Sequence, residues 1–305
     1  MAGYKLLKRL DVILHLIEAY PYISKSELID RLADDYNIVT TKRTIERDFR
    51  ALSLDFGIEL TYCTTRNGYR LSEEDEQRIQ SFLRYVELVH VGELFKQGLN
   101  DFDVLRQTIA LEDSSKFKGI HLIKPLLLAV KQSQSVNFIY ENYSRETHHN
   151  YKITPLQIRE YLNRWYVIGV PEGETHIRTF GLDRISDLKL SEYSTIKISE
   201  FETQLDKFNN VVGLNYNASE KQEFIRVAVT EKQYKYLRSL PLHQSQTLEK
   251  ELDDQRLEVS FYLKPNFEFK MHILKMGSRI EVLSPDWLRE EIKTELHNSF
   301  KQYKS

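Results

Sequence analysis

The sequence has 305 residues, of which 41% are hydrophobic, and this length and composition predict two or three domains with cores of their own. The longest apolar run, Pro125 to Val130, is far too short to cross a membrane. The single cysteine, Cys63, excludes an intramolecular disulfide and a multi-cysteine zinc site, which favours a reducing cytoplasm. The formal net charge of −2 gives no overall attraction to nucleic acid, so such binding would need a local basic patch.

Three helices are predicted in the first quarter of the chain. Residues 4–19 place apolar side chains at 3.6-residue spacing. The run Ser24-Lys25-Ser26-Glu27 is a capping box that begins a second helix, because the serine hydroxyl can accept from the glutamate amide. Thr40 or Thr41 can begin a third helix, which buries a stripe around Ile45 and leaves basic residues on its outer face.

A hairpin is predicted next, in "IELTYCTTRNGYRLS". Apolar residues alternate on both sides of Asn67-Gly68, and this dipeptide favours a two-residue type I′ turn, in which both residues have positive φ. Three helices and a hairpin predict a winged helix-turn-helix, with the third helix in the major groove. The alternative is a solvated basic face on a structural helix. The residues assigned to DNA are Thr41, Thr44 and Arg47 for phosphates, Lys42, Arg43 and Arg50 for base edges, and Arg66 and Asn67 at the wing tip.

The stretch "TTKRTIERDFRALSLDFGIEL" resembles the winged helix of the DeoR-type bacterial regulators, whose third helix often reads S-x-R-T-I-x-R-D-L-x-x-L. Phe49 stands where the usual pattern has leucine. The resemblance covers about the first quarter of the chain and implies sequence-specific binding to double-stranded DNA. The matching residues are Arg43, Thr44, Ile45, Arg47, Asp48 and Leu52.

A helical linker is predicted after the hairpin. Ser72 can cap a helix over residues 73–98, in which Ile79, Phe82, Leu83, Val86 and Val89 form an apolar stripe. We expect this stripe to pack on the chain's own body or on a second subunit. Residues 99–118 are polar and poorly periodic, and no element is predicted there.

Short strands are predicted in the middle of the chain, after an apolar helix at 121–133. Five or six of them, separated by tight turns, predict a small curled antiparallel sheet or barrel. In "RWYVIGV", alternation places Trp165 and Val167 on one face and Arg164 and Tyr166 on the other.

The stretches "ITPLQIREYLNRWYVIG" and "IRTFGLDRISDL" resemble the WYL domain of bacterial transcription regulators. The resemblance implies an SH3- or Sm-like β-barrel that senses an effector, with nucleotides or nucleic-acid fragments as the suggested ligands. The motif falls on Trp165, Tyr166 and Val167, where valine replaces leucine. Gly181 stands where the family often has arginine, which removes a candidate phosphate contact.

The candidate effector site is a groove in which aromatic rings stack on a ligand and arginines or a histidine hold phosphate. The alternative reading is that Trp165 fills the core and that Asp183 and Arg184 form a structural ion pair. His148 and His149 are neighbours on a strand with no third ligand at suitable spacing, so no metal site is predicted. The assigned residues are Tyr140, His149, Arg164, Trp165, Tyr166, Arg178, Phe180 and Arg184.

The last segment alternates strands and helices in the order βαββαβ, which predicts a split-βαβ, ferredoxin-like unit. Ser284-Pro285 then begins a terminal helix. "GSRIEVLSPDWLREEI" resembles the C-terminal extension of WYL regulators, which in that family contributes to dimerisation and ligand closure.

Together these patterns predict an α+β multidomain protein: a winged helix-turn-helix at 1–72, a helical linker at 73–118, a WYL domain at 119–206 and a C-terminal extension at 207–305. The predicted function is a cytoplasmic bacterial transcription regulator that binds an inverted-repeat operator as a homodimer and responds to an effector, without a cofactor. The alternatives are an accessory nucleic-acid-binding subunit and an enzyme localised by its DNA-binding head. The sequence has no glycine-rich phosphate loop and no convincing carboxylate cluster, which argues against an enzyme.

Overall fold

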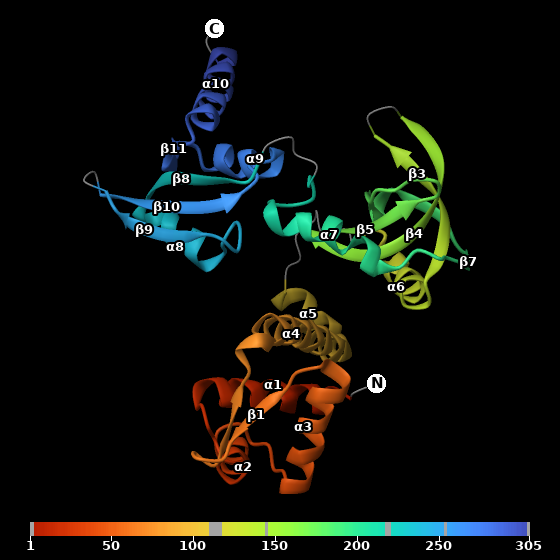
Figure 1. Cartoon of the computed structure of the whole chain (residues 1–305), viewed down its shortest axis with the longest axis vertical. Helices are drawn as coiled ribbons and strands as arrows, with labels where there is room; N and C mark the ends of the chain where they lie inside the picture. The colour runs from red at the N-terminus through yellow and green to blue at the C-terminus, as the bar shows by residue number, and fades with distance from the viewer. Residues whose placement is uncertain (1–2, 110–117, 144–145, 217–220, 253–254, 304–305) are drawn as a thin grey trace. The chain divides into compact units, whose positions relative to one another are not determined.

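The computed structural model describes residues 3–109, 118–143, 146–216, 221–252 and 255–303 (Figure 1). The described residues form a mixed α+β structure with ten α-helices and three sheets, none of them closed. The chain divides into two compact units, unit 1 (Met1–Glu112) and unit 2 (Asp113–Ser305). Residues 110–117 of the expected linker lie outside the described residues. None of the helices described is long and apolar enough to span a membrane.

Unit 1 begins with the three predicted helices and the hairpin. Ser24 Oγ accepts from the Glu27 amide at 3.2 Å, as the capping box predicts. Thr41 rather than Thr40 caps the third helix, accepting from the Thr44 amide at 3.3 Å. The elements are α1 (Tyr4–Ala19), α2 (Lys25–Asp34), α3 (Lys42–Phe56), β1 (Leu60–Cys63) and β2 (Gly68–Leu71).

The hairpin differs from the predicted two-residue turn. Cys63 pairs with Gly68, so the loop between the strands has four residues, and only Asn67 has a positive φ, of 52°. Gly68 is needed for a different reason. A Cβ at Gly68 would lie 1.7 Å from the Tyr22 carbonyl oxygen, because β2 passes directly against the loop between α1 and α2.

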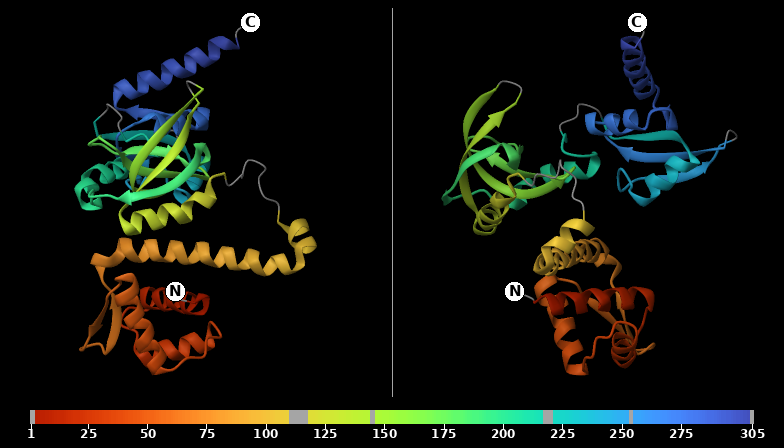
Figure 2. Two further views of the ribbon diagram at one scale, coloured as in Figure 1. Left: turned by 90° about the vertical axis from the view of Figure 1, so that its right-hand side faces the viewer. Right: turned by 180° about the vertical axis from the view of Figure 1, so that it is seen from behind.

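The core of unit 1, here called the head core, is built from α1, α2, α3 and the first half of α4 (Glu76–Gly98). Figure 2 shows α4 as one long helix beside α1. Its buried side chains are Ile79, Phe82, Leu83 and Val86, whereas Val89, which was predicted in the same stripe, is exposed. The short helix α5 (Phe102–Thr108) follows, in a stretch where no element was predicted.

An ion pair joins α1 to α3 inside this unit. Asp48 is fully buried, and Arg9 Nη2 donates to its Oδ1 at 2.8 Å while Arg9 Nε donates to Oδ2. Both carboxylate oxygens are thus satisfied by the guanidinium fork. The aspartate of the DeoR-like motif is therefore a structural residue.

We predict that Asp48→Ala lowers the free energy of unfolding of unit 1 by about 3 kcal/mol, because it leaves the Arg9 guanidinium without its buried partner. Asp55→Ala, at an exposed position of the same helix, should change it by less than about 0.5 kcal/mol. Urea titration read out by hydrogen exchange of the α1 and α3 amides measures both variants. Equal losses would contradict a structural role for the pair.

Unit 2 begins with α6 (Ile123–Gln132) and a five-stranded antiparallel sheet of order β6-β5-β4-β3-β7. Of the two predicted alternatives, sheet or barrel, the structure has the sheet, since no pairing joins the edge strands β6 and β7 in the described residues. The strand β6 is only four residues long, and β7 pairs along β3 at the far edge. The strands are β3 (Gln134–Asn142), β4 (Thr147–Tyr161), β5 (Arg164–Pro171), β6 (Arg178–Gly181) and β7 (Ile185–Tyr193).

The two faces of this sheet bury different cores. On the face toward α6, here called the inner face, Val167 is buried and Trp165 packs against the same core. On the outer face, Ile168 and Val170 pack with Phe208 and its neighbours from the segment that follows β7. The predicted alternation of β5 is therefore confirmed.

The rest of unit 2 is a four-stranded sheet with helices, in the element order that the sequence predicts. The strand order is β11-β8-β10-β9, so β10 lies between β8 and β9 and is antiparallel to both. Its core includes Phe261 and Phe269. The elements are β8 (Glu223–Thr230), α8 (Glu231–Ser239), β9 (Thr247–Glu251), β10 (Arg256–Leu263), α9 (Phe267–Met276), β11 (Ile280–Ser284) and α10 (Asp286–Gln302).

Candidate nucleic-acid interface and effector site

The outer face of α3 is a row of arginines. Arg43, Arg47 and Arg50 follow at helical spacing on the side opposite the buried Ile45 and Leu52, and all three are exposed. None of the three makes an ion pair with any residue that the structure describes. Their guanidinium groups are therefore available to phosphates or base edges.

Two of the three acidic side chains on α3 are neutralised by residues of other helices. Asp48 is held inside by Arg9, and Glu46, on the outer side, lies 3.0 Å from the Lys25 Nζ of α2. The hydrogen bond from Lys25 lowers the pKa of Glu46, so this carboxylate stays charged and paired. Sequence analysis missed Lys25 and Arg9, because neither partner lies at helical spacing from the acid that it neutralises.

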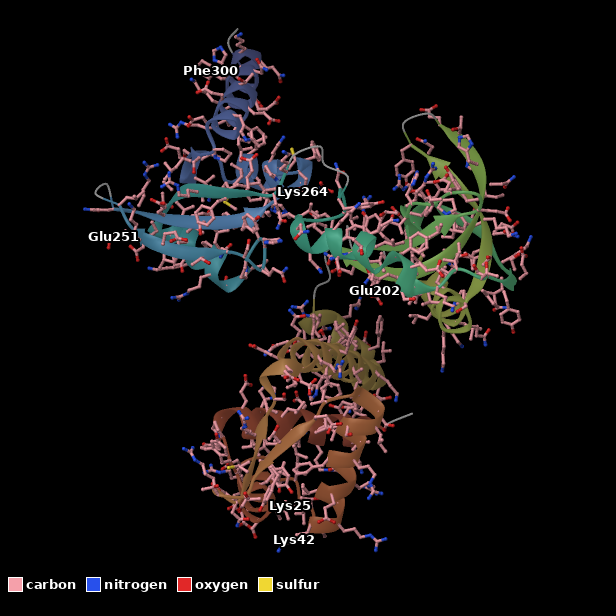
Figure 3. All side chains as sticks on the ribbon, in the orientation of Figure 1. Lys25, Lys42, Glu202, Glu251, Lys264 and Phe300 are labelled. Atoms are coloured by element: carbon pink, nitrogen blue, oxygen red, sulfur yellow. The ribbon has the colours of Figure 1, made fainter. Side chains whose placement is uncertain are left out.

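The first turn of α3 carries the other predicted DNA contacts. Lys42 is exposed, and its side chain lies at the same end of unit 1 as that of Lys25 (Figure 3). Thr41 Oγ1 is 3.1 Å from Thr44 Oγ1 and also accepts from the Thr44 amide. These hydroxyls stabilise a helix N-terminus, and such an end attracts phosphate through its free amides.

The wing tip is held against the body of unit 1. The Arg66 guanidinium lies 4.4 Å from the centre of the Tyr22 ring, and Asn67 accepts a hydrogen bond from the Tyr62 hydroxyl. Both residues are exposed. The structure therefore places all eight predicted DNA contacts on the outer side of α3 or at the wing tip, which are elements of one unit.

Four aromatic rings pack together on the inner face of the five-stranded sheet. Phe180 is 4.9 Å from Tyr151 and 5.2 Å from Tyr140, centre to centre, in edge-to-face contacts, and Phe138 lies beside them. Phe180 is buried, so its ring belongs to the core and not to an open groove. Tyr140 is half-buried, and its hydroxyl oxygen accepts from the Gly181 amide at 3.3 Å.

Arg184 occupies the space beside Gly181. Its guanidinium lies 4.9 Å from the Tyr140 ring centre and 5.2 Å from that of Tyr143. A Cβ at Gly181 would lie 2.6 Å from Asp183 Oδ1 and 3.2 Å from Arg184 Nε. An arginine is thus absent at position 181 but present next to it, stacked on tyrosines.

The ion pair of Asp183 is with Arg164, at 3.6 Å, and not with Arg184 as the alternative reading supposed. Tyr166, two residues after Arg164 on β5, is half-buried and faces Arg159 across the strand pair. Burial lowers the pKa of Arg159, whose guanidinium lies 4.6 Å from the centre of the Phe208 ring.

Five of the eight predicted effector residues lie near one another, and three lie apart from them. Arg164 pairs with Asp183, and burial raises the pKa values of both Tyr166 and Tyr140, on which the charges of Asp183 and Arg184 also act. Tyr140 and Arg184 lie together with His149, which is exposed and opposite Tyr140 in the strand register. The other three are tied to the inner side of the sheet: Trp165 and Phe180 pack in its core, and Arg178, which faces Gly169, pairs with Glu174 at 2.7 Å.

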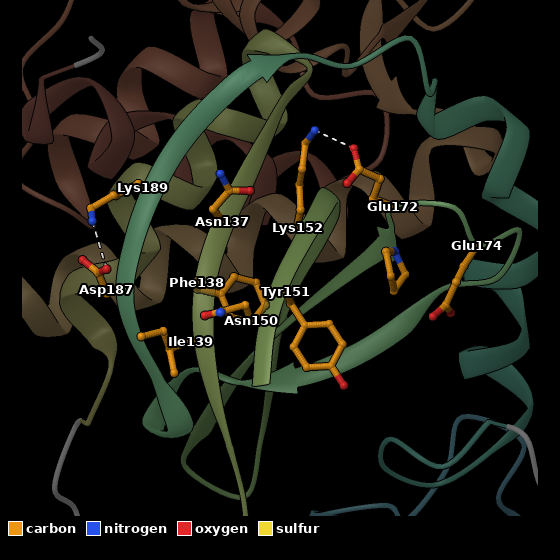
Figure 4. A pocket seen from close by; sticks show the side chains of 11 residues that line it. Asn137, Phe138, Ile139, Asn150, Tyr151, Lys152, Glu172, Glu174, Asp187 and Lys189 are labelled. Carbon is orange, nitrogen blue, oxygen red and sulfur yellow. Dashed lines mark hydrogen bonds and ion pairs between the residues drawn. The ribbon is translucent and has the colours of Figure 1, made fainter. Parts of the chain in front are cut away.

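A polar pocket of about 640 Å³ lies elsewhere on this sheet (Figure 4). Its lysines are paired, Lys189 with Asp187 at 2.9 Å and Lys152 with Glu172 at 2.5 Å. Amide side chains that can both donate and accept lie between them, which suits a polar ligand of little net charge. None of the eight predicted effector residues lines it. Its lining includes Asn137, Ile139, Asn150, Lys152, Glu172, Glu174, Asp187 and Lys189.

No group of three or more potential metal-ligating side chains is found in the part of the chain that the structure describes. The clustered effector candidates Tyr140, His149, Arg164, Tyr166 and Arg184 offer guanidinium, phenol and imidazole groups. These groups bind and orient anions and planar rings.

Sequence comparison recognises two domains, a WYL domain at residues 121–190 and a WCX domain at residues 221–298. The first makes the chain a WYL-domain protein, and it covers α6 and all five strands of the sheet described above except the end of β7. The chain therefore contains a WYL domain followed by a WCX domain.

No curated protein matches the chain significantly. Among solved structures, proteasome accessory factor B/C (PafBC) of Arthrobacter aurescens is 13% identical with a TM-score of 0.33, and the match covers 95% of this chain and 46% of that one. This chain thus spans about half the length of that protein. A CRISPR Cas-related protein is 16% identical with a TM-score of 0.40, over 99% of this chain and 86% of that one.

We predict that Tyr140→Phe destabilises the WYL domain by about 1 kcal/mol, because the Gly181 amide loses its acceptor in a half-buried position. Tyr143→Phe, at an exposed ring, should have almost no effect. Urea unfolding followed by Trp165 fluorescence in a Trp287→Phe background separates the two. If Tyr140→Phe left the free energy of unfolding unchanged, the hydroxyl would not stabilise the domain.

Proposed function

We propose that this chain is a transcription regulator that binds duplex DNA through α3 and the hairpin of unit 1 and responds to an effector bound at the WYL domain. The observation that carries the proposal is the row of exposed, unpaired arginines on α3, Arg43, Arg47 and Arg50, in a chain that also has WYL and WCX domains. The row lies on a helix that follows two others and precedes a hairpin, which is the arrangement of a winged helix-turn-helix.

The proposed architecture assigns residues 1–72 to the winged helix-turn-helix, 73–118 to a helical linker, 119–206 to an Sm-like WYL domain and 207–305 to a ferredoxin-like extension. As a homodimer on an inverted repeat, the protein would set two α3 helices in successive major grooves, about 34 Å apart. It acts in the bacterial cytoplasm, without a cofactor and without catalysis of its own.

The effector class that we propose is a nucleotide or a nucleic-acid fragment. The support is chemical: Arg184 stacks on Tyr140 and Tyr143, and His149 faces the same side of the strand pair. Guanidinium groups hold phosphate, and tyrosine rings stack on bases. Effector control requires that the ligand bind the DNA-competent and the incompetent states with different affinity.

The experiment that tests the proposal is selection of bound duplexes from a random DNA pool by the full chain, with fluorescence anisotropy of the selected sequence. Enrichment of an inverted repeat is the expected result. Binding to single strands with no preferred duplex would instead favour an accessory nucleic-acid-binding subunit, and no retention of either would reject both.

We predict that Arg43→Ala weakens binding to the selected duplex by about 1–3 kcal/mol, since a guanidinium that contacts a base edge is lost. Arg238→Ala removes an exposed arginine of α8 in unit 2 and should leave the affinity unchanged. Anisotropy titrations at matched salt concentration compare the two. Equal affinities for Arg43→Ala and the unmodified chain would remove Arg43 from the interface.

We predict that Arg184→Gln abolishes the effect of a 5′-phosphorylated single-stranded oligonucleotide on operator affinity, while operator affinity without the oligonucleotide stays the same. The reason is loss of a guanidinium that holds phosphate. Lys124→Gln, at an exposed position on α6, is the control and should retain the response. If Arg184→Gln responds like the unmodified chain, the effector site lies elsewhere.

A further inference from the structure

The helix α4 has a second apolar side that the head core does not use. Its buried side chains, such as Phe82 and Val86, face the head core. About half a turn away around the helix lie Leu88 and Phe95, at 100° per residue. We call this second side the α4 seam. Its members are Tyr85, Leu88, Gly92 and Phe95 of α4, and Leu99, which begins the 3₁₀ turn directly after the helix.

The spacing of the seam is that of a coiled coil. Its residues follow one another at alternating intervals of three and four, the pattern in which a helix presents one continuous stripe to a second helix. Three members are open to solvent, with exposed fractions of 68% for Tyr85, 59% for Leu88 and 60% for Leu99, whereas Phe95 is half-buried. An apolar stripe of this size marks a contact surface for another protein surface.

Gly92 points to the kind of contact. It lies inside a helix of 23 residues, where glycine is less favourable than alanine. A Cβ at this position would have no atom within 4 Å, so nothing in the chain itself requires a glycine there. A second helix that crosses closely at this point does require one, because only glycine lets two backbones approach so near.

We propose that the α4 seam binds the α4 seam of a second copy of this chain, with the two helices antiparallel. A two-fold axis midway between Gly92 and Phe95 places each glycine opposite Phe95 of the partner subunit. The same axis places Leu88 opposite Leu99 of the partner subunit. The phenylalanine thus fills the hole that the glycine leaves, and the layers of Gly92 with Phe95 and of Leu88 with Leu99 are matched by the chain's own sequence.

This inference rests on the proposed function, because it locates the contact that makes the regulator a dimer. Each α4 is then held between its own head core and the partner's α4. The crossing fixes the distance between the two α3 helices that read an inverted repeat. A change in the crossing changes that distance and is a route by which an effector alters DNA affinity.

The first test is the oligomeric state of the full chain, measured by sedimentation velocity over a concentration series. We expect Leu88→Glu to weaken self-association at least about 100-fold, because it buries an unpaired charge in the seam. Leu94→Glu is the matched control: its exposed fraction is 57% on the same helix, but it lies off the seam, and it should leave the dimer intact. Loss of the dimer in both variants or in neither overturns the proposal, as does a monomeric unmodified chain.

The second test is the direction of the pairing, in a Cys63→Ser background. Mixed Leu88→Cys and Leu99→Cys chains should form a disulfide with each other under mild oxidation. Leu88→Cys chains alone should not, because antiparallel helices place the two copies of residue 88 about 16 Å apart along the axis. Cross-linking of Leu88→Cys with itself and not with Leu99→Cys would show a parallel pair and overturn the antiparallel arrangement.

The third test separates this inference from the proposed function. Leu88 lies outside the head core, so Leu88→Glu should bind a single half-site as tightly as the unmodified chain and should lose the additional affinity for the full inverted repeat. Equal affinity of Leu88→Glu and the unmodified chain for the full repeat overturns the seam. Failure of the unmodified chain to bind any duplex rejects the proposed function, whereas a dimer that Leu88→Glu disrupts still supports the seam.

Discussion

The buried ion pair of Arg9 and Asp48 sets how α3 is rotated, and the proposed DNA-binding face depends on that rotation. Asp48 can be buried only because a guanidinium satisfies both of its oxygens, and α1 supplies that guanidinium. With Asp48 turned inward beside Ile45 and Leu52, the arginines at the other positions must point outward. The same pair removes a negative charge from the helix that carries the positive face. The Arg9–Asp48 pair therefore contributes both to the stability of unit 1 and to the positive charge of the outer face of α3.

Local patterns in the sequence predicted the elements that depend on local sterics. The caps at Ser24 and Thr41, the buried stripe of α3 and the alternation along β5 each follow from spacing within one element. Ion pairs between residues on different helices were not predictable in this way. Lys25 pairs with Glu46 at a distance of 21 residues, and Arg9 with Asp48 at 39, and no periodicity links them. The candidate DNA face was thus predicted as a set of positions, but the reason for its net charge came from tertiary contacts.

The wrong predictions share a physical cause, which is that one residue type can serve two purposes. Gly68 was assigned to a tight turn, yet it is needed because the Tyr22 backbone lies against it. Phe180 was assigned to a ligand groove, yet its edge-to-face contacts place it in the core. A ring that can stack on a base can equally stack on tyrosine, and only the packing of the sheet decides between them. The polar pocket beside Asn137 and Lys152 escaped notice because the opposite, aromatic face of the same strands gave the stronger signal.

Position 181 shows the limit of transferring the residue roles of a family motif to this chain by sequence position alone. The family arginine is replaced by glycine, which by sequence removes a phosphate contact. In the fold, the chain turns after β6 so that the side chain of Arg184 returns to Gly181, and the absence of a Cβ leaves room for its guanidinium and for Asp183. Asp183 is held by Arg164, so Arg184 keeps its charge for the tyrosines and for an anion. The glycine and Arg184 therefore form one arrangement, in which a guanidinium three residues further along the chain lies beside position 181.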